Sequence, residues 1–129
     1  MHAIQEILAE IESFETDEGN WQRLDELVVE LWKSGNPEHG IDALFTIFER
    51  YPTENGDGVF WTILHGLETL NYEAKLYNSL MKKPSHMAIT MLKRIENTNS
   101  RMIAGKSISE LKEYIKNNPK TDLVLLDEL

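Results

Sequence analysis

Four side chains recur at helical spacing in the middle of this chain and are its strongest candidates for chemistry. Trp61, His65, Glu68 and Tyr72 follow each other at intervals of four, three and four residues, which places them on one stripe of a helix. A histidine and a carboxylate one turn apart can share a proton or supply two ligands to a metal ion. The same spacing is typical of a central helix buried on two sides, whose imidazole and carboxylate satisfy each other. We predict this second, structural role for the stripe.

Other catalytic and metal-binding patterns are missing from the sequence. It contains no cysteine, which excludes disulfides, thiolate nucleophiles and cysteine-based metal sites. It also lacks a Gly-x-Ser-x-Gly elbow, a Gly-x-x-x-x-Gly-Lys phosphate loop and a His-Glu-x-x-His zinc helix. Asp57 lies in a glycine-rich turn without the ligand pattern of a calcium loop, and we expect it to cap the next helix. We therefore predict no catalytic residue, metal ligand or cofactor, and an enzyme that depends on His65 and Glu68 is the less favoured alternative.

Charge is distributed unevenly along the chain. Residues 1–74 carry 16 acidic and 3 basic side chains, a balance of −13, while residues 75–129 carry 6 acidic and 10 basic, which brings the net charge to −9. Some of the acids recur one helical turn apart, where like charges repel. An acidic surface can steer a basic partner, although a solvated face that only maintains solubility is the alternative. The candidate partner-binding residues are Glu6, Glu10, Glu26, Glu30, Glu54 and Asp57.

The same composition argues against several other partners. Direct nucleic-acid binding needs clustered lysine and arginine, which are scattered here. The longest apolar runs are far shorter than the ~20 residues of a membrane span. The chain also begins without the basic and apolar regions of a secretory signal, so we expect a cytoplasmic protein. Its oligomeric state is left open.

The elements that position these residues are predicted to be helices throughout. Ser107 and Glu110 form a Ser-x-x-Glu capping box at the start of one of them. The short connections favour antiparallel neighbours, so we predict a single all-α domain over residues 1–129. Its seven or eight short helices would form a HEAT-like array or, alternatively, an irregular bundle. The apolar stripes of helical period span residues 4–14, 21–32, 41–48, 60–70, 76–81, 88–95 and 108–115, with a further short helix after residue 119.

A central part of the chain resembles a known family. The run Gly-Asp-Gly-Val-Phe-Trp-Thr-Ile-Leu-His-Gly-Leu-Glu at 56–68, with Tyr-Glu at 72–73, Pro-Ser at 84–85 and Met-Leu-Lys-Arg-Ile-Glu-Asn at 91–97, is similar to small all-helical immunity proteins of bacterial polymorphic-toxin and contact-dependent growth-inhibition systems. The resemblance covers about residues 56–97. It implies a cytoplasmic protein that neutralises one cognate toxin domain, often a nuclease, by covering its active site or substrate surface. A helical adaptor that docks a peptide in an apolar groove is the alternative binding function.

Overall fold

The computed structural model describes residues 3–129 and confirms the predicted all-α fold. Between the last two α-helices lies a small hairpin of β1 (Met102–Ile103) and β2 (Lys106–Ser107), which the helical pattern did not predict. Three short 3-10 segments are η1 (Pro37–Gly40), η2 (Gly56–Gly58) and η3 (Leu123–Glu128). The α-helices are α1 (Ile4–Ser13), α2 (Gln22–Lys33), α3 (Ile41–Arg50), α4 (Val59–Leu67), α5 (Glu73–Lys82), α6 (His86–Glu96) and α7 (Ile108–Asn117).

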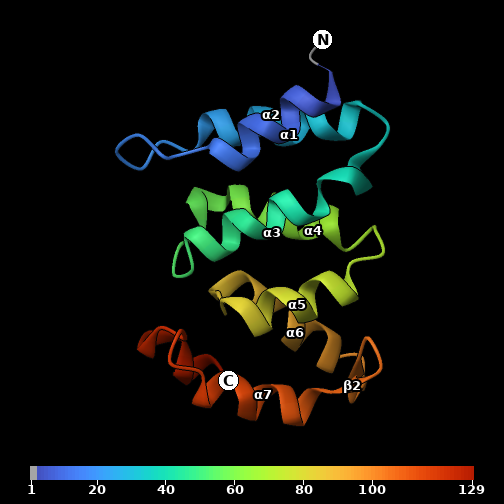
Figure 1. Cartoon of the computed structure of the whole chain (residues 1–129), viewed down its shortest axis with the longest axis vertical. Coiled ribbons are helices and arrows are strands. Elements are labelled where there is room, and N and C mark those ends of the chain that lie inside the picture. The colour runs from blue at the N-terminus through green and yellow to red at the C-terminus, as the bar shows by residue number, and fades with distance from the viewer. Residues whose placement is uncertain (1–2) are drawn as a thin grey trace.

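The helices form four stacked layers (Figure 1). Each of the first three layers is a helix pair, α1 with α2, α3 with α4 and α5 with α6, and the fourth combines α7 with η3. Along one row α1 packs on α3, α3 on α5 and α5 on α7, while along the other α2 packs on α4, α4 on α6 and α6 on η3. Two parallel rows of helices, to which successive helices belong in turn, are the arrangement of a HEAT-like array rather than of an irregular bundle.

Aromatic side chains fill the boundary between the first two layers. The indole of Trp21 meets the rings of Phe60 and Tyr51 edge-on, with centroid distances of 5.1 and 5.0 Å. Phe48 lies 5.4 Å from Phe60, and both rings are fully buried. Arg50, at the end of α3, donates hydrogen bonds to two carbonyl groups at the end of α1, at 2.7 and 2.9 Å. The first layer is therefore joined to the second by an aromatic cluster and by a cation that caps α1.

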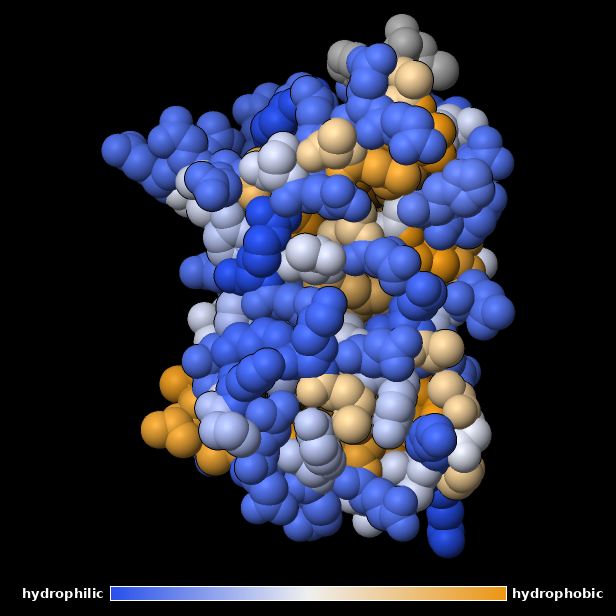
Figure 2. Space-filling model, in the orientation of Figure 1, coloured by the Kyte–Doolittle hydropathy of each residue, from blue (hydrophilic) through white to orange (hydrophobic). Residues whose placement is uncertain are grey.

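The surface is largely hydrophilic on the face drawn in Figure 2. An apolar patch projects at the lower left, where Figure 1 places η3 at the last layer. Leu123 and Val124 of this segment are 80% and 65% exposed. Within residues 3–129, no helix is long and apolar enough to cross a membrane.

Candidate functional site

Trp61 and His65 of the stripe lie on the outer face of α4, so the prediction that the stripe faces other helices is wrong for these two residues. The side chain of His65 is 60% exposed, and Trp61 is also exposed, with its ring centroid 6.0 Å from that of His65. The buried residues of α4 are Phe60, Ile63, Leu64 and Leu67. These residues already occupy the faces that contact the neighbouring layers, which leaves Trp61 and His65 to solvent.

Glu68 is held by an arginine from the next layer. The guanidinium of Arg94 on α6 donates from Nε to Oε2 at 2.7 Å and from Nη2 to Oε1 at 2.9 Å, which is a bidentate pair. His65 Nδ1 lies farther away, 3.7 Å from Oε1. Because both carboxylate oxygens bond Arg94, Glu68 is not poised to act with His65 as a proton relay. Among residues 3–129, no group of three or more acidic or histidine side chains could hold a metal ion.

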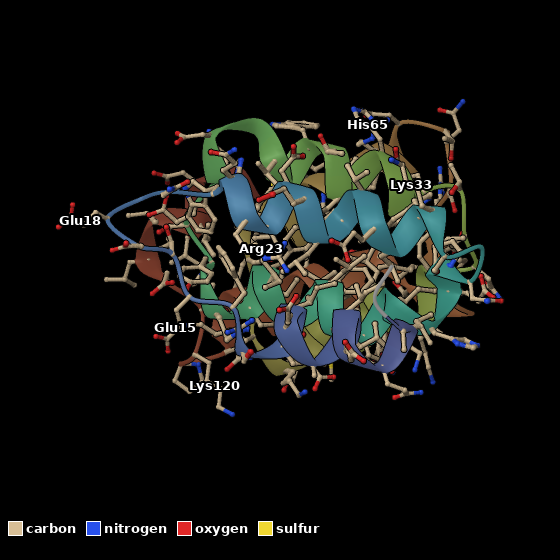
Figure 3. All side chains as sticks on the ribbon, turned by 90° about the horizontal axis from the view of Figure 1, so that it is seen from above. Glu15, Glu18, Arg23, Lys33, His65 and Lys120 are labelled. Atoms are coloured by element: carbon tan, nitrogen blue, oxygen red, sulfur yellow. The ribbon has the colours of Figure 1, made fainter. Side chains whose placement is uncertain are left out.

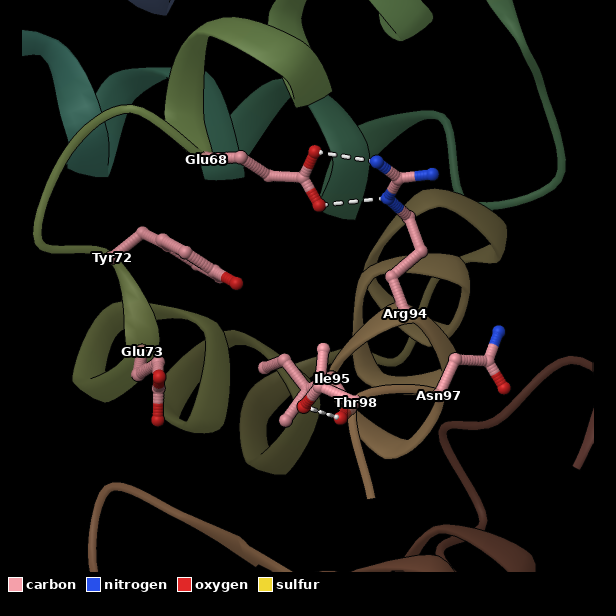
Figure 4. Close-up of a pocket in the computed structure, with 7 residues that line it drawn as sticks. All are labelled: Glu68, Tyr72, Glu73, Arg94, Ile95, Asn97 and Thr98. Carbon is pink, nitrogen blue, oxygen red and sulfur yellow. Dashed lines mark hydrogen bonds and ion pairs between the residues drawn. The ribbon is translucent and has the colours of Figure 1, made fainter. Parts of the chain in front are cut away.

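A polar pocket of about 410 Å³ opens beside this ion pair (Figure 4). Burial raises the pKa of the Tyr72 phenol, and the charges of Glu68 and Glu73 raise it further. The hydrogen bonds to Glu68 raise the pKa of Arg94. Tyr72 is thus neutral and Arg94 charged near pH 7, so this pocket holds an ion pair rather than an activated base. The lining residues are Glu68, Tyr72, Glu73, Arg94, Ile95, Asn97 and Thr98.

The four glutamates predicted on the first two helices divide into two classes. Arg23 of α2 forms an ion pair with Glu10 of α1, and its other terminal nitrogen lies 3.9 Å from Glu30. Glu6 and Glu26 are exposed and form no ion pair within the described part of the chain. Within residues 3–129, only these two of the four therefore present a carboxylate without a cationic partner.

Glu54 and Asp57 lie in the loop between α3 and α4, and both are exposed. The predicted cap is wrong: Gly58 occupies the N-cap position of α4, and no side chain bonds there. Asp57 instead has φ 52° and lies between Gly56 and Gly58, whose φ values are 59° and 92°. Its backbone N–H donates to Asn55 Oδ1 at 3.1 Å. Three successive left-handed residues turn the chain sharply and leave the Asp57 carboxylate free of a capping bond.

The sequence reasoning missed three acids at the tip of the first hairpin, Glu15, Asp17 and Glu18, all of which are exposed. Glu18 has φ 50° and Gly19 has φ 79°, and the N–H of Asn20 bonds the carbonyl of Asp17 at 2.9 Å, which closes a tight turn. Figure 3 shows Glu15 and Glu18 at one end of the molecule, and Figure 1 places the α3–α4 loop at the same end. The acidic run Glu-Thr-Asp-Glu-Gly at residues 15–19 was the sequence feature from which these three acids could have been predicted as site residues. We call Glu15, Asp17, Glu18, Glu54 and Asp57 the acidic edge.

Acids nearer the middle of the chain pair with the basic half. Lys75 of α5 lies 3.1 Å from Asp42 of α3, and Lys82 lies 3.8 Å from Glu49. Together with the pair of Glu68 and Arg94, these contacts join the second layer to the third. Ten of the thirteen acids that form no ion pair within residues 3–129 lie in the first layer, in η1 or in the α3–α4 loop, and the other three are Glu73, Glu110 and Asp127. The ten are Glu6, Glu12, Glu15, Asp17, Glu18, Asp25, Glu26, Glu38, Glu54 and Asp57.

Comparisons with known proteins give no relative for this arrangement. A scan against protein families found no match, and neither did searches of curated proteins and of solved structures.

Proposed function

We propose that this chain is an immunity protein, which binds and neutralises a cognate bacterial toxin domain of basic charge in the cytoplasm. The observation that carries the proposal is the division of its acids into two groups. Those of the second layer pair with the third layer, whereas those of the first layer and the acidic edge, except for Glu10 and Glu30 beside Arg23, form no ion pair with the described residues. Unpaired like charges in one region destabilise a fold unless an external cation compensates them, so they support binding of a basic partner.

A basic nuclease is the toxin class that fits this surface best. Nucleases that grip phosphates carry clustered lysine and arginine, and carboxylates at the acidic edge would occupy those positions in place of the nucleic-acid backbone. Inhibition would follow from covering the active site or the substrate surface and needs no chemistry from this chain. The resemblance of residues 56–97 to immunity proteins supports the same class.

The first test is genetic and biochemical. We expect the neighbouring reading frame to encode a secreted protein that ends in a toxin domain, and cells that express this domain should survive only when they also express the chain. Purified toxin domain should bind the chain, with an association rate that falls steeply as salt rises. A neighbour without a toxin domain, or cells that die despite the chain, would contradict the proposal.

A charge-reversal series tests the surface itself. Replacing Glu6 and Glu26 together by lysine should slow association about tenfold at low salt, because both carboxylates contribute to the negative field at the surface that would meet the partner. The matched control reverses Glu110 and Asp127, two exposed acids of the last layer that form no ion pair within residues 3–129, and should leave the rate nearly unchanged. Glu10→Lys and Glu30→Lys should also slow association, but they additionally place a cation beside Arg23. An association rate that ignores salt and the Glu6 and Glu26 changes would refute steering by this surface.

A further inference from the structure

An apolar groove of about 390 Å³ runs between α2 and α4, the helices that lie side by side in Figure 3. Gly66 shapes it, since a Cβ atom there would lie 2.5 Å from Cζ2 of Trp32. Without that atom, the indole of Trp32 lies directly against the backbone of α4. The groove volume is near the lower end of ligand pockets, roughly 300–1,000 Å³. Its lining residues are Val28, Val29, Trp32, Lys33, Thr62 and Gly66.

Large apolar side chains on the two helices that form the groove are exposed to solvent. Val29, on its α2 wall, is 43% exposed, and Trp61, one residue before the groove residue Thr62, is 38% exposed. Tryptophan is enriched among the residues that dominate binding energy at protein interfaces. An apolar hollow with an exposed valine on its wall, formed in part by a helix that also carries an exposed tryptophan, is the expected form of a pocket that receives one large side chain from a partner.

The charged residues along the groove indicate which charge a partner segment would carry. Asp25 and Glu26 lie about one helical turn before Val29, are exposed, and form no ion pair with residues 3–129. Asp57, in the turn that leads into α4, adds a third free carboxylate at the beginning of that helix. Lys33 lies at the opposite end of α2, and Figure 3 shows it far from the acidic edge residue Glu18. The groove is therefore acidic at the end nearer the acidic edge.

We propose that the groove between α2 and α4 receives a large apolar side chain from a basic partner segment, with a lysine or arginine of that segment placed against Asp25 and Glu26. The inference rests on the proposed function, because the partner's positive charge comes from there. It adds the anchor point, since steering by charge speeds association whereas a buried apolar contact slows dissociation.

Two designed peptides of about 18 residues probe the groove, a length at which an isolated helix can form. Both carry leucines at helical spacing, flanked by lysine in one peptide and by glutamate in the other. The leucine–lysine peptide should shift the amide resonances of Val29 and Thr62, and the leucine–glutamate peptide should not. The variant Thr62→Phe, which fills the groove without a change of charge, should weaken the leucine–lysine peptide at least about tenfold. The control Ser109→Phe, at an exposed position of α7, should bind it like the unaltered chain.

The outcomes separate the two proposals. Leucine–lysine shifts confined to the acidic edge, or binding that survives Thr62→Phe, would overturn the groove even if the chain neutralises a toxin. A homodimer that Thr62→Phe dissociates would overturn it too, because a second copy would then occupy the groove. A chain whose groove binds the peptide as expected but that protects against no toxin domain would instead overturn the immunity function.

Discussion

Replacing Gly56 by alanine tests whether the α3–α4 loop depends on its left-handed backbone. Gly56 has φ 59°, and a Cβ atom there would lie 2.6 Å from Cδ1 of the fully buried Phe60. The left-handed conformation costs a residue with a Cβ atom about 1–2 kcal/mol, and overpacking the core costs a further 1–3 kcal/mol or so. Alanine also lowers the conformational entropy of the unfolded chain, which offsets roughly 0.4–1 kcal/mol of this loss in stability. We therefore expect Gly56→Ala to lower the free energy of unfolding by about 2–4 kcal/mol.

Gly58→Ala is the matched control for this change. Gly58 has φ 92°, but nothing lies within 4 Å of the position a Cβ atom would take. It carries the conformational cost without the contact with Phe60, so its loss should be about 1 kcal/mol. Urea unfolding followed by tryptophan fluorescence gives both values, provided that the slope of the transition is unchanged. Equal losses in the two variants, or no loss in Gly56→Ala, would refute the contact with the Phe60 ring.

Three further changes address the side chains around α4 and the end of α1. His65→Ala should change the free energy of unfolding by less than about 0.5 kcal/mol, because the imidazole is exposed; a loss above 1 kcal/mol in a urea melt would mean that it packs inward. Glu68→Gln should lower the pKa of Tyr72, since the Glu68 charge helps to raise it. Because the pKa of Tyr72 is raised in the folded protein, the unfolded chain loses the phenol proton at lower pH than the folded one. The free energy of unfolding should therefore fall as the pH rises above ~10, and it should fall less steeply in Glu68→Gln. The absorbance of the phenolate, compared with that of Tyr72→Phe, measures the titration. Arg50→Leu should cost about 2–3 kcal/mol through its two charged hydrogen bonds to α1, and an unchanged urea midpoint would contradict that capping role.

Helical periodicity predicted the fold class because every α-helix carries one apolar stripe that is buried. The capping box was also readable, and the Ser107 hydroxyl does accept a hydrogen bond from the N–H of Glu110 at 3.2 Å. The β-hairpin was not readable, since its strands have two residues each and depend on a turn in which Ala104 and Gly105 have φ values of 49° and 77°. Local pattern therefore suffices for the helices and for the cap at Ser107, and it fails where the backbone leaves its usual regions, as at the β-hairpin turn and at the predicted Asp57 cap.

The candidate site was predicted less completely, because its properties depend on contacts between helices. The spacing that joins His65 to Glu68 says nothing about which side of the helix the other layers cover, so burial was predicted where the structure has solvent. Likewise, the like-charged pairs of α1 and α2 were visible in the sequence. That Arg23 reaches Glu10 across the hairpin and approaches Glu30 was not visible, since it requires the register of the two helices.

The stacked layers also decide where the molecule opens first. In an array each unit is held mainly by its nearest neighbours, so a terminal unit with one neighbour unfolds at lower free energy than an internal one. Within residues 3–129, the first and the fourth layer each pack on one neighbouring layer, and the first also carries most of the carboxylates without an ion pair, which repel one another more as salt is removed. Amide hydrogen exchange should therefore be fastest in α1 and α2 at low ionic strength. A cation-rich protein bound to the first layer would stabilise its folded state. The folding of this layer and the binding of the partner are then thermodynamically linked.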